Sequence, residues 1–234
     1  MKIAIIPARG GSKRIPRKNI RNFMGKPMLH WPIKAAIESG LFDHIIVSTD
    51  SEEIAEEALK AGALVPFLRP QHLADDHAVT REVINHAIIA CQKLFGAFEH
   101  CCCIYATSPF LLKDDLQASL DILIERESNF VFSATPYAFP IQRAFFKKPD
   151  GSIEMFYPEH IKTRSQDLTP AFHDVGMFYW GKTESFLRNQ PMFSGSSHPY
   201  LIPPYRVCDL DTAEDWEKAE WMMRAILIQR DAYE

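Results

Sequence analysis

A basic segment near the N-terminus, residues 7–19 with the sequence PARGGSKRIPRKN, has the residue types that bind phosphate groups. Gly10 and Gly11 let backbone N–H groups approach an anion closely, because neither carries a side chain. The other candidates are a hydroxyl donor and three cations that can neutralise phosphate charge: Ser12, Arg9, Lys13 and Lys18. The segment therefore predicts a binding site for a polyphosphate, such as a nucleoside triphosphate.

The segment matches neither of two well-known phosphate-binding motifs. The order G-x-x-x-x-G-K-[ST] is absent, and so is G-x-G-x-x-G. Pro16 rules out a helix that starts directly after the glycines and continues. A solvated basic loop or an RNA-binding patch is the competing interpretation, since basic runs often form these.

Charge is distributed unevenly along the chain. The 234 residues carry a formal net charge of −4, yet nine bases and no acid precede Glu38. A general nucleic-acid or membrane-surface binder needs a broadly basic surface, so the overall charge argues against both classes. No apolar run approaches the roughly 20 residues of a membrane helix. A small anionic ligand near the N-terminal end accounts for the asymmetry.

Five cysteines without paired spacing indicate reduced thiols. The early apolar run IAII is too short for the core of a signal peptide, so we expect a cytoplasmic protein. Three of the cysteines, Cys101, Cys102 and Cys103, are adjacent. On a strand they would alternate between two faces, which favours buried apolar residues over a metal site.

Strand-like and helix-like segments alternate through the first 135 residues. The strand-like runs are residues 2–8, 44–49, 63–68, 101–107 and 129–135, and the helical patterns are residues 27–39, 51–62, 79–94 and 114–126. This alternation predicts an α/β fold with a mostly parallel sheet and helices on both faces. Ligands of such sheets bind beyond the carboxyl ends of the strands, where the basic segment lies.

The alternation breaks at about residues 137–171. Within this stretch, FFKKPDGSIEMFYPEH predicts a hairpin around Asp150 and Gly151. We expect an inserted arm in a single domain spanning residues 1–234. A strand at 175–181, an edge piece at 200–204 and a closing helix at 212–230 complete the predicted fold.

Asp209 and Asp211 are separated by one residue, so in an extended segment both carboxylates project to one side. Hard oxygen ligands held together, with phosphate oxygens in the other positions, suit Mg²⁺. The competing interpretation is structural, with Asp211 as the N-cap of the last helix and Glu214 as its capping partner. The two interpretations are compatible.

Six motifs spread over most of the chain occur together: IIPARGGSKRIPRKNI, IIVSTDSEEIAEEA, LRPQHLADDHA, ATSP, RSQDLTPAFHDVG and DLDTAEDW. This set resembles the CMP-sialic acid synthetases, cytidylyltransferases that activate nine-carbon α-keto acid sugars. The resemblance implies a Rossmann-like nucleotide-diphospho-sugar transferase fold. It also implies that CTP and the sugar give the CMP-sugar and pyrophosphate with Mg²⁺.

The resemblance assigns nucleotide contacts residue by residue. Arg9, Ser12 and Lys13 would contact the phosphates, with Gly10 and Gly11 between them, and Lys18 and Asn19 would lie near the ribose and α-phosphate. In LRPQHLADDHAVT, Arg69 would read the base. The same nucleotide-binding set includes Asp76, Ala78 and Thr80.

Three residues, Arg9, Lys18 and Asp211, would be catalytic. Arg9, with Lys13 and the metal, would neutralise the leaving pyrophosphate, and Lys18 would neutralise the α-phosphate. The Asp209 and Asp211 pair would hold the metal. The sugar's C2 hydroxyl would attack the α-phosphorus in line. Asp211 and a metal-bound hydroxide both remain open as its general base.

The sugar-side residues differ from those of the sialic acid synthetases. Tyr105 replaces a Gln, and His173 and Asp174 replace an Arg-Pro pair. These differences resemble the pseudaminic acid branch, whose sugar occurs on bacterial flagellin and surface polysaccharides. The sugar-binding candidates are Tyr105, Thr107, Arg164, Gln166, His173 and Asp174, with Phe110 as a further wall. In the family the arm reaches a second subunit, which implies a homodimer.

Three alternatives remain open. The same reaction could use legionaminic or N-acetylneuraminic acid. A nucleotidyltransferase of this fold could instead use UTP or GTP. A nucleotide-binding module without turnover is also compatible with the fold, because fold does not fix function.

Overall fold

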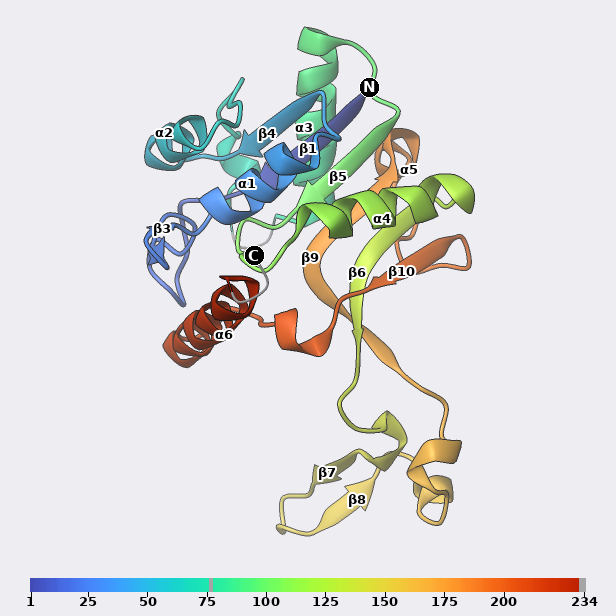
Figure 1. The fold of residues 1–234 in the computed structure, drawn as a ribbon. Coiled ribbons are helices and arrows are strands. Elements are labelled where there is room, and N and C mark those ends of the chain that lie inside the picture. The colour runs from blue at the N-terminus through green and yellow to red at the C-terminus, as the bar shows by residue number, and fades with distance from the viewer. Residues whose placement is uncertain (76–77, 232–234) are drawn as a thin grey trace.

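The computed structural model describes residues 1–75 and 78–231. It contains a six-stranded sheet with helices on both faces, as the alternation of segments predicts (Figure 1). The strands, in the order β10-β6-β9-β5-β1-β4, are β10 (Ser197–Leu201), β6 (Phe130–Pro136), β9 (Phe172–Lys182), β5 (His100–Ile104), β1 (Lys2–Pro7) and β4 (His44–Ser48). The predicted edge piece is therefore the edge strand β10.

The sheet is parallel except at β9, which is antiparallel to both β5 and β6. The chain leaves the sheet at the end of β6, forms the arm and returns alongside β6 as β9 (Figure 1). A return beside the strand that the chain has just left must run in the opposite direction. The predicted mostly parallel sheet is confirmed, with this one antiparallel strand in its middle.

Two hydrophobic clusters fill the two sides of the sheet. One contains side chains of α1 (His30–Ser39), α2 (Glu52–Lys60), α4 (Lys113–Glu125) and α6 (Ala213–Asp231). The other contains side chains of α3 (Thr80–Phe95) and α5 (Thr183–Leu187). The final helix buries Trp216, Ala219 and Met223, and Ile226 is partly buried against the same cluster. Five short 3₁₀ helices connect these elements: η1 (Gln71–Leu73), η2 (Ile141–Arg143), η3 (Pro158–His160), η4 (Ser165–Asp167) and η5 (Pro204–Arg206).

The strand predicted at residues 63–68 does not form. Two isolated bridges, Ile46–Leu64 and Thr49–Leu68, hold this segment against the edge of β4. Pro66 lies between them and has no N–H to donate, so a continuous ladder is interrupted.

The first helix begins at His30 rather than at Pro27. Pro27 instead pairs with Asn22 in a small hairpin of β2 (Asn22–Phe23) and β3 (Lys26–Pro27). Met24 and Gly25 at the turn have φ values of +51° and +86°, the left-handed conformation of a tight hairpin turn. Gly40 ends the helix as predicted, with φ +64°.

The three adjacent cysteines are buried as predicted. Cys101 and Cys103 pack in the cluster with α3, whereas Cys102 faces the opposite cluster. All five thiols are free of disulfides. Burial raises the pKa of the Cys91 thiol to about 11, so this residue is an inert apolar one at neutral pH.

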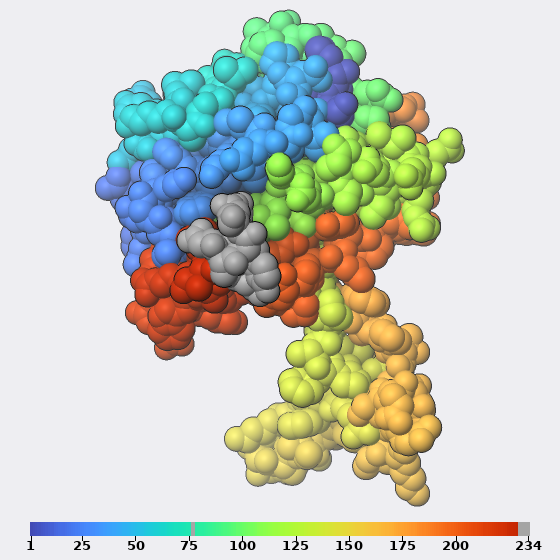
Figure 2. Space-filling view, in the orientation of Figure 1, coloured from blue at the N-terminus to red at the C-terminus, as the bar shows by residue number. Residues whose placement is uncertain are grey.

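The arm, residues 137–171, projects away from the sheet (Figure 2). Its hairpin consists of β7 (Phe145–Lys147) and β8 (Ile153–Met155), around Asp150 and Gly151 as predicted. Large apolar side chains on the arm face solvent, including Phe139 at 81% and Ile161 at 65% exposure. Within the described residues, no helix combines the length and apolarity needed to span a bilayer.

Candidate functional site

A cleft of about 420 Å³ opens beside the carboxyl ends of β1 and β5. Eight of the eleven predicted nucleotide-binding residues line it, together with nine further residues. The lining residues are Pro7, Arg9, Ser12, Lys13, Arg14, Ile15, Lys18, Asn19, Arg69, Leu73, Asp75, Ala78, Thr80, Val83, Tyr105, Ala106 and Thr107. Residues from three separate parts of the sequence, 7–19, 69–83 and 105–107, therefore line one cavity. The α/β topology predicts this convergence at the carboxyl ends of the strands.

The basic loop is held by internal hydrogen bonds. The Asn19 side chain donates to the Arg9 carbonyl at 2.9 Å, and Asn19 is only 7% exposed. Asn19 thus lines the cleft and also fixes the loop, a positioning role that the sequence pattern did not indicate.

Gly10 has a structural role in the protein that differs from its predicted one. The Gly10 N–H donates to Asp50 Oδ1 at 2.9 Å, so it serves the protein rather than an anion. A Cβ at Gly10 would lie 3.1 Å from the Ser51 Cβ, whereas one at Gly11 would meet nothing within 4 Å. Neither glycine lines the cleft. Gly10 is needed because the loop passes closely over the start of α2.

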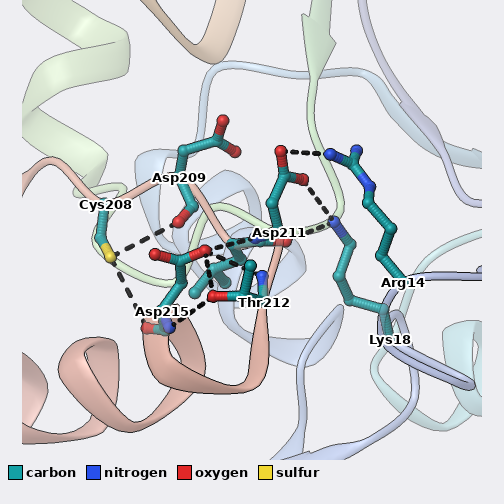
Figure 3. A network of polar contacts seen from close by, with 8 residues as sticks. Arg14, Lys18, Cys208, Asp209, Asp211, Thr212 and Asp215 are labelled. Atoms are coloured by element: carbon teal, nitrogen blue, oxygen red, sulfur yellow. Dashed lines mark hydrogen bonds and ion pairs between the residues drawn. The ribbon is translucent and has the colours of Figure 1, made fainter. Parts of the chain in front are cut away.

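Lys18 connects the loop to the C-terminal segment (Figure 3). Its Nζ donates to the Leu210 carbonyl at 2.6 Å and lies 3.8 Å from Asp211 Oδ1. Burial lowers the pKa of the Lys18 ammonium, and the nearby Asp211 carboxylate partly opposes that shift. Arg14 also contacts the Asp211 carboxylate. The sequence did not single out Arg14, which is one of several cations in the same loop.

Asp209 and Asp211 lie on the same side of an extended segment, with Leu210 buried between them (Figure 3). Neither aspartate lines the cleft itself, but Asp211 contacts Arg14 and approaches Lys18, which do. Asp211 therefore sits at the rim of the cleft.

The helix cap falls one residue later than the competing interpretation expects. Thr212 Oγ1 accepts from the Asp215 N–H at 3.1 Å, and Asp215 Oδ2 accepts from the Thr212 N–H at 2.8 Å. This reciprocal pair caps α6, and Glu214 is not part of it. The Asp211 side chain is thus left for Lys18, Arg14 and a ligand.

The aspartate pair fits Mg²⁺ only as a partial ligand set. Among residues 1–75 and 78–231, no group of three His, Cys, Asp or Glu side chains is arranged to hold a metal. Two carboxylates supply hard oxygen ligands, and Mg²⁺ commonly completes its shell with phosphate oxygens and water. Phosphates in the adjacent cleft would supply them, so the residues present fit this metal.

Arg69 is buried at 6% exposure in the cleft wall. Its Nε donates to Ser48 Oγ at 3.2 Å, and a second guanidinium nitrogen contacts the Ser48 carbonyl. A third contact, from Nη1 to the Leu73 carbonyl, is 3.5 Å long. The structure therefore places Arg69 in the nucleotide cleft but uses several of its donors to fix the end of β4 and the η1 turn.

The segment after η1 closes one side of the cleft. Arg9 Nη1 donates to the Asp75 carbonyl at 3.0 Å, and Asp75 Oδ1 accepts from the Ala78 N–H at 2.7 Å. Asp75 was not predicted, although it lies next to predicted Asp76. Asp76 itself lies outside the described residues.

Tyr105 divides the cleft from a second cavity of about 220 Å³, and its ring lies 5.5 Å from that of Tyr179. This cavity is lined by Thr80, Arg81, Ile84, Cys103, Tyr105, Asp174, Tyr179, Phe186, Met192 and Phe193. The Tyr179 hydroxyl donates to Asp174 Oδ2 at 2.5 Å, and burial raises the pKa of both tyrosines. Of the sugar-binding candidates, Tyr105, Thr107 and Asp174 are thus brought together.

The other sugar-binding candidates lie elsewhere. His173 packs against Tyr137, with ring centres 4.7 Å apart, at the base of the arm. Arg164 and Gln166 are exposed on the arm, where Arg164 Nε pairs with Asp167 Oδ2 at 2.7 Å. None of these residues lines the cleft of its own chain. Phe110 is buried and borders a different hollow, so it does not line the cleft of its own chain.

Residues 3–215 match the protein family described as cytidylyltransferase. The chain belongs to this cytidylyltransferase family. A pseudaminic acid cytidylyltransferase of Campylobacter jejuni subsp. jejuni serotype O:2 is 46% identical over 218 residues, covering 93% of this chain and 94% of the relative. The CMP-N,N'-diacetyllegionaminic acid synthase of Legionella pneumophila is 30% identical over 228 residues, covering 94% and 95%. The predicted family and enzyme class, a nucleotidyltransferase, are confirmed.

The fold is shared with a more distant cytidylyltransferase. A structure of CMP:2-keto-3-deoxy-manno-octonic acid synthetase complexed with CTP matches with a TM-score of 0.69 and 14% sequence identity. The match covers 96% of this chain and 98% of that structure. At this level of identity the likeness supports the fold, and the roles of individual residues rest on the cleft described above.

Proposed function

We propose that this cytidylyltransferase transfers CMP from CTP to pseudaminic acid and releases pyrophosphate. The observation that carries the proposal is the convergence of Lys18, Arg14 and Asp211 at the rim of a cation-lined cleft. The 46% identity to the Campylobacter pseudaminic acid enzyme favours this sugar.

The chain's own residues would stabilise charge rather than form covalent bonds. Arg9 and Lys13 would bind the phosphates that leave, and Lys18 would contact the α-phosphate, where negative charge develops during the transfer. Asp209 and Asp211 would hold Mg²⁺, which supplies further neutralisation of phosphate charge. The sugar's C2 oxygen forms the new bond to the α-phosphorus as the bond to the pyrophosphate oxygen breaks. Asp211 would be the residue of this chain placed to accept the proton of the C2 hydroxyl.

The base would lie against Ala78 and Thr80, on the wall that Arg69 supports. Because the Arg69 guanidinium donates hydrogen bonds to Ser48 and Leu73, we assign Arg69 mainly to shaping this wall. Backbone groups of the adjacent segment would then read the pyrimidine edge.

The sugar would extend past Tyr105 toward Asp174 in the second cavity. That cavity combines one carboxylate with apolar side chains such as Met192 and Phe193, which suits a sugar with acylamino groups and a deoxy end. Arg164 and Gln166 would reach the site only from the arm of a second subunit. The exposed apolar surface of the arm supports a homodimer, because such patches commonly mark interfaces. We place the reaction in the cytoplasm, where five unpaired thiols stay reduced.

Pyrophosphate release tests the proposal when purified protein, CTP and Mg²⁺ are combined separately with pseudaminic, legionaminic and N-acetylneuraminic acids. Turnover is expected with pseudaminic acid, and CTP should be preferred over UTP and GTP. Turnover only with another sugar would keep the chemistry and overturn the assigned specificity. Tight CTP binding without turnover on any sugar would indicate a nucleotide-binding module instead.

A further inference from the structure

A buried ion pair lies outside the cleft, between Asp115 at the start of α4 and Arg206 in η5. The contact is bidentate, with Arg206 Nη1 2.7 Å from Asp115 Oδ2 and Nη2 2.8 Å from Oδ1. Exposure is 2% for Asp115 and 7% for Arg206. Such a fork fixes both distance and orientation, because two parallel bonds join two planar groups.

The pair joins the start of α4 to β10 and η5, which lie far from it in sequence. Asp115 Oδ2 also accepts from the Leu112 N–H at 3.0 Å, and Asp115 Oδ1 accepts from the Tyr200 hydroxyl at 3.1 Å. Arg206 Nη1 additionally donates to the Phe110 carbonyl at 3.3 Å. The start of α4, the strand β10 and the turn η5 are therefore held at one point.

Each side of this clamp, defined as Asp115, Arg206 and Tyr200, continues directly into the functional site. Phe110, which the clamp holds, lies three residues after Thr107 in the cleft wall. Arg206 lies three residues before Asp209 and five before Asp211.

The segment that carries the two aspartates is also anchored in its middle and at its far end. At its far end, Asp215 accepts from the Asp211 N–H at 3.1 Å as part of the α6 cap. In its middle, Lys18 donates to the Leu210 carbonyl at 2.6 Å. Its near end follows η5, whose position the Arg206 fork determines.

Stability alone does not explain a charged pair at this place. Removing two charges from water is costly, and apolar residues of similar volume often replace a buried pair without loss of stability. What an apolar pair lacks is the fixed geometry of the fork.

We propose that Arg206 and Asp115 are positioning residues, which set the register of the Asp209 and Asp211 carboxylates against the nucleotide cleft. This inference rests on the proposed function, because it requires that these aspartates hold the metal. The clamp acts through the backbone and touches neither metal nor substrate.

Mn²⁺ binding provides the test, measured by electron paramagnetic resonance on the full chain with CTP and without sugar. Arg206→Lys keeps the charge but loses the fork. The double variant Arg206→Met with Asp115→Asn leaves no unpaired charge, and its carboxamide still accepts from the Leu112 N–H. Ile88→Val, in the opposite core cluster, is a control for general destabilisation.

Both fork variants are expected to bind Mn²⁺ at least fivefold more weakly than the unaltered protein. The double variant should do so even though its thermal midpoint stays close to that of Ile88→Val, which should bind normally. In turnover, the apparent KM for Mg²⁺ should rise more than kcat falls. Should Arg206→Lys fail to fold, Tyr200→Phe, which removes one donor to Asp115, should weaken Mn²⁺ binding about twofold.

Normal Mn²⁺ binding by a folded double variant would overturn the inference, as would equal weakening in Ile88→Val. Asp211→Asn, measured in parallel, separates this failure from that of the proposed function. If Asp211→Asn does not weaken Mn²⁺ binding, the metal assignment is wrong and the inference falls with it.

Discussion

The guanidinium of Arg14 contacts the carboxylate of Asp211, 197 residues further along the chain. Lys18 approaches the same carboxylate to 3.8 Å. The contacts join the basic loop to the C-terminal aspartates. They bring the cations proposed to bind phosphate close to an aspartate proposed to hold the metal.

Replacing Asp211 by asparagine should reduce kcat by about two to three orders of magnitude, as loss of a key electrostatic group does in other enzymes. The change is nearly isosteric, so the fold should be retained. Initial rates of pyrophosphate release and a thermal melt would measure both effects. Near-normal kcat would remove Asp211 from the catalytic set.

Arg14→Gln should increase the affinity of the nucleotide-free protein for Mn²⁺ by roughly two- to fivefold, because the guanidinium competes with the metal for Asp211. Arg17→Gln is the matched control, since Arg17 carries the same charge in the same loop but pairs with Glu53. Isothermal titration calorimetry with Mn²⁺ would measure the affinity of each variant. Equal affinities would show that only the overall loop charge matters.

Gly10→Ala should disturb the loop, since the new Cβ would lie 3.1 Å from the Ser51 Cβ. We expect a stability loss of about 1 kcal/mol, as in other overpacked sites, and weaker CTP binding. Gly11→Ala has open space and should change CTP affinity much less. Equilibrium measurements of CTP affinity for the two variants test whether packing at Gly10 matters for binding. If both bind CTP equally well, the packing argument fails.

The buried Cys91 thiol should make stability fall at alkaline pH. Burial raises the pKa of this thiol from 9.0 to about 11, so the folded state keeps a proton that the unfolded state has lost. The contribution of the Cys91 thiol to the free energy of unfolding is fully present below pH 9 and is lost as the pH rises to about 11. The slope is at most about 1.4 kcal/mol per pH unit for one thiol. Urea unfolding between pH 8 and 11 should be less steeply pH-dependent in Cys91→Ala than in Ile88→Val.

Subunit mixing tests the role of the arm. If Arg164 serves the site of a partner, Arg164→Ala and Asp211→Asn should each be weakly active, and mixed dimers should regain activity. One site of such a dimer combines an intact arm with an intact aspartate pair. Co-expression with two affinity tags isolates the mixed dimer. No regain of activity would argue against a shared site.

Local sequence patterns predicted the fold well where periodicity and turn residues agree. The strands around the basic loop and the hairpin at Asp150 and Gly151 follow from such patterns. The failures have physical causes. Pro66 breaks an apolar run that otherwise resembles a strand, and the direction of β9 depends on where the arm returns the chain.

The site was predicted in composition more than in geometry. The loop cations and the aspartate pair were evident from residue type and spacing. The use of the Gly10 N–H by Asp50 and of Arg69 by Ser48 depends on tertiary contacts that no local pattern encodes. The clamp of Asp115 and Arg206 was missed for the same reason, because its members are separated by 91 residues.

The most direct test of the account is ³¹P nuclear magnetic resonance of CTP, Mg²⁺ and pseudaminic acid with the purified protein. The account predicts loss of the α-phosphate signal of CTP and matched growth of one phosphodiester signal and one of pyrophosphate. An unchanged CTP spectrum, from protein that is folded and binds CTP, would contradict it.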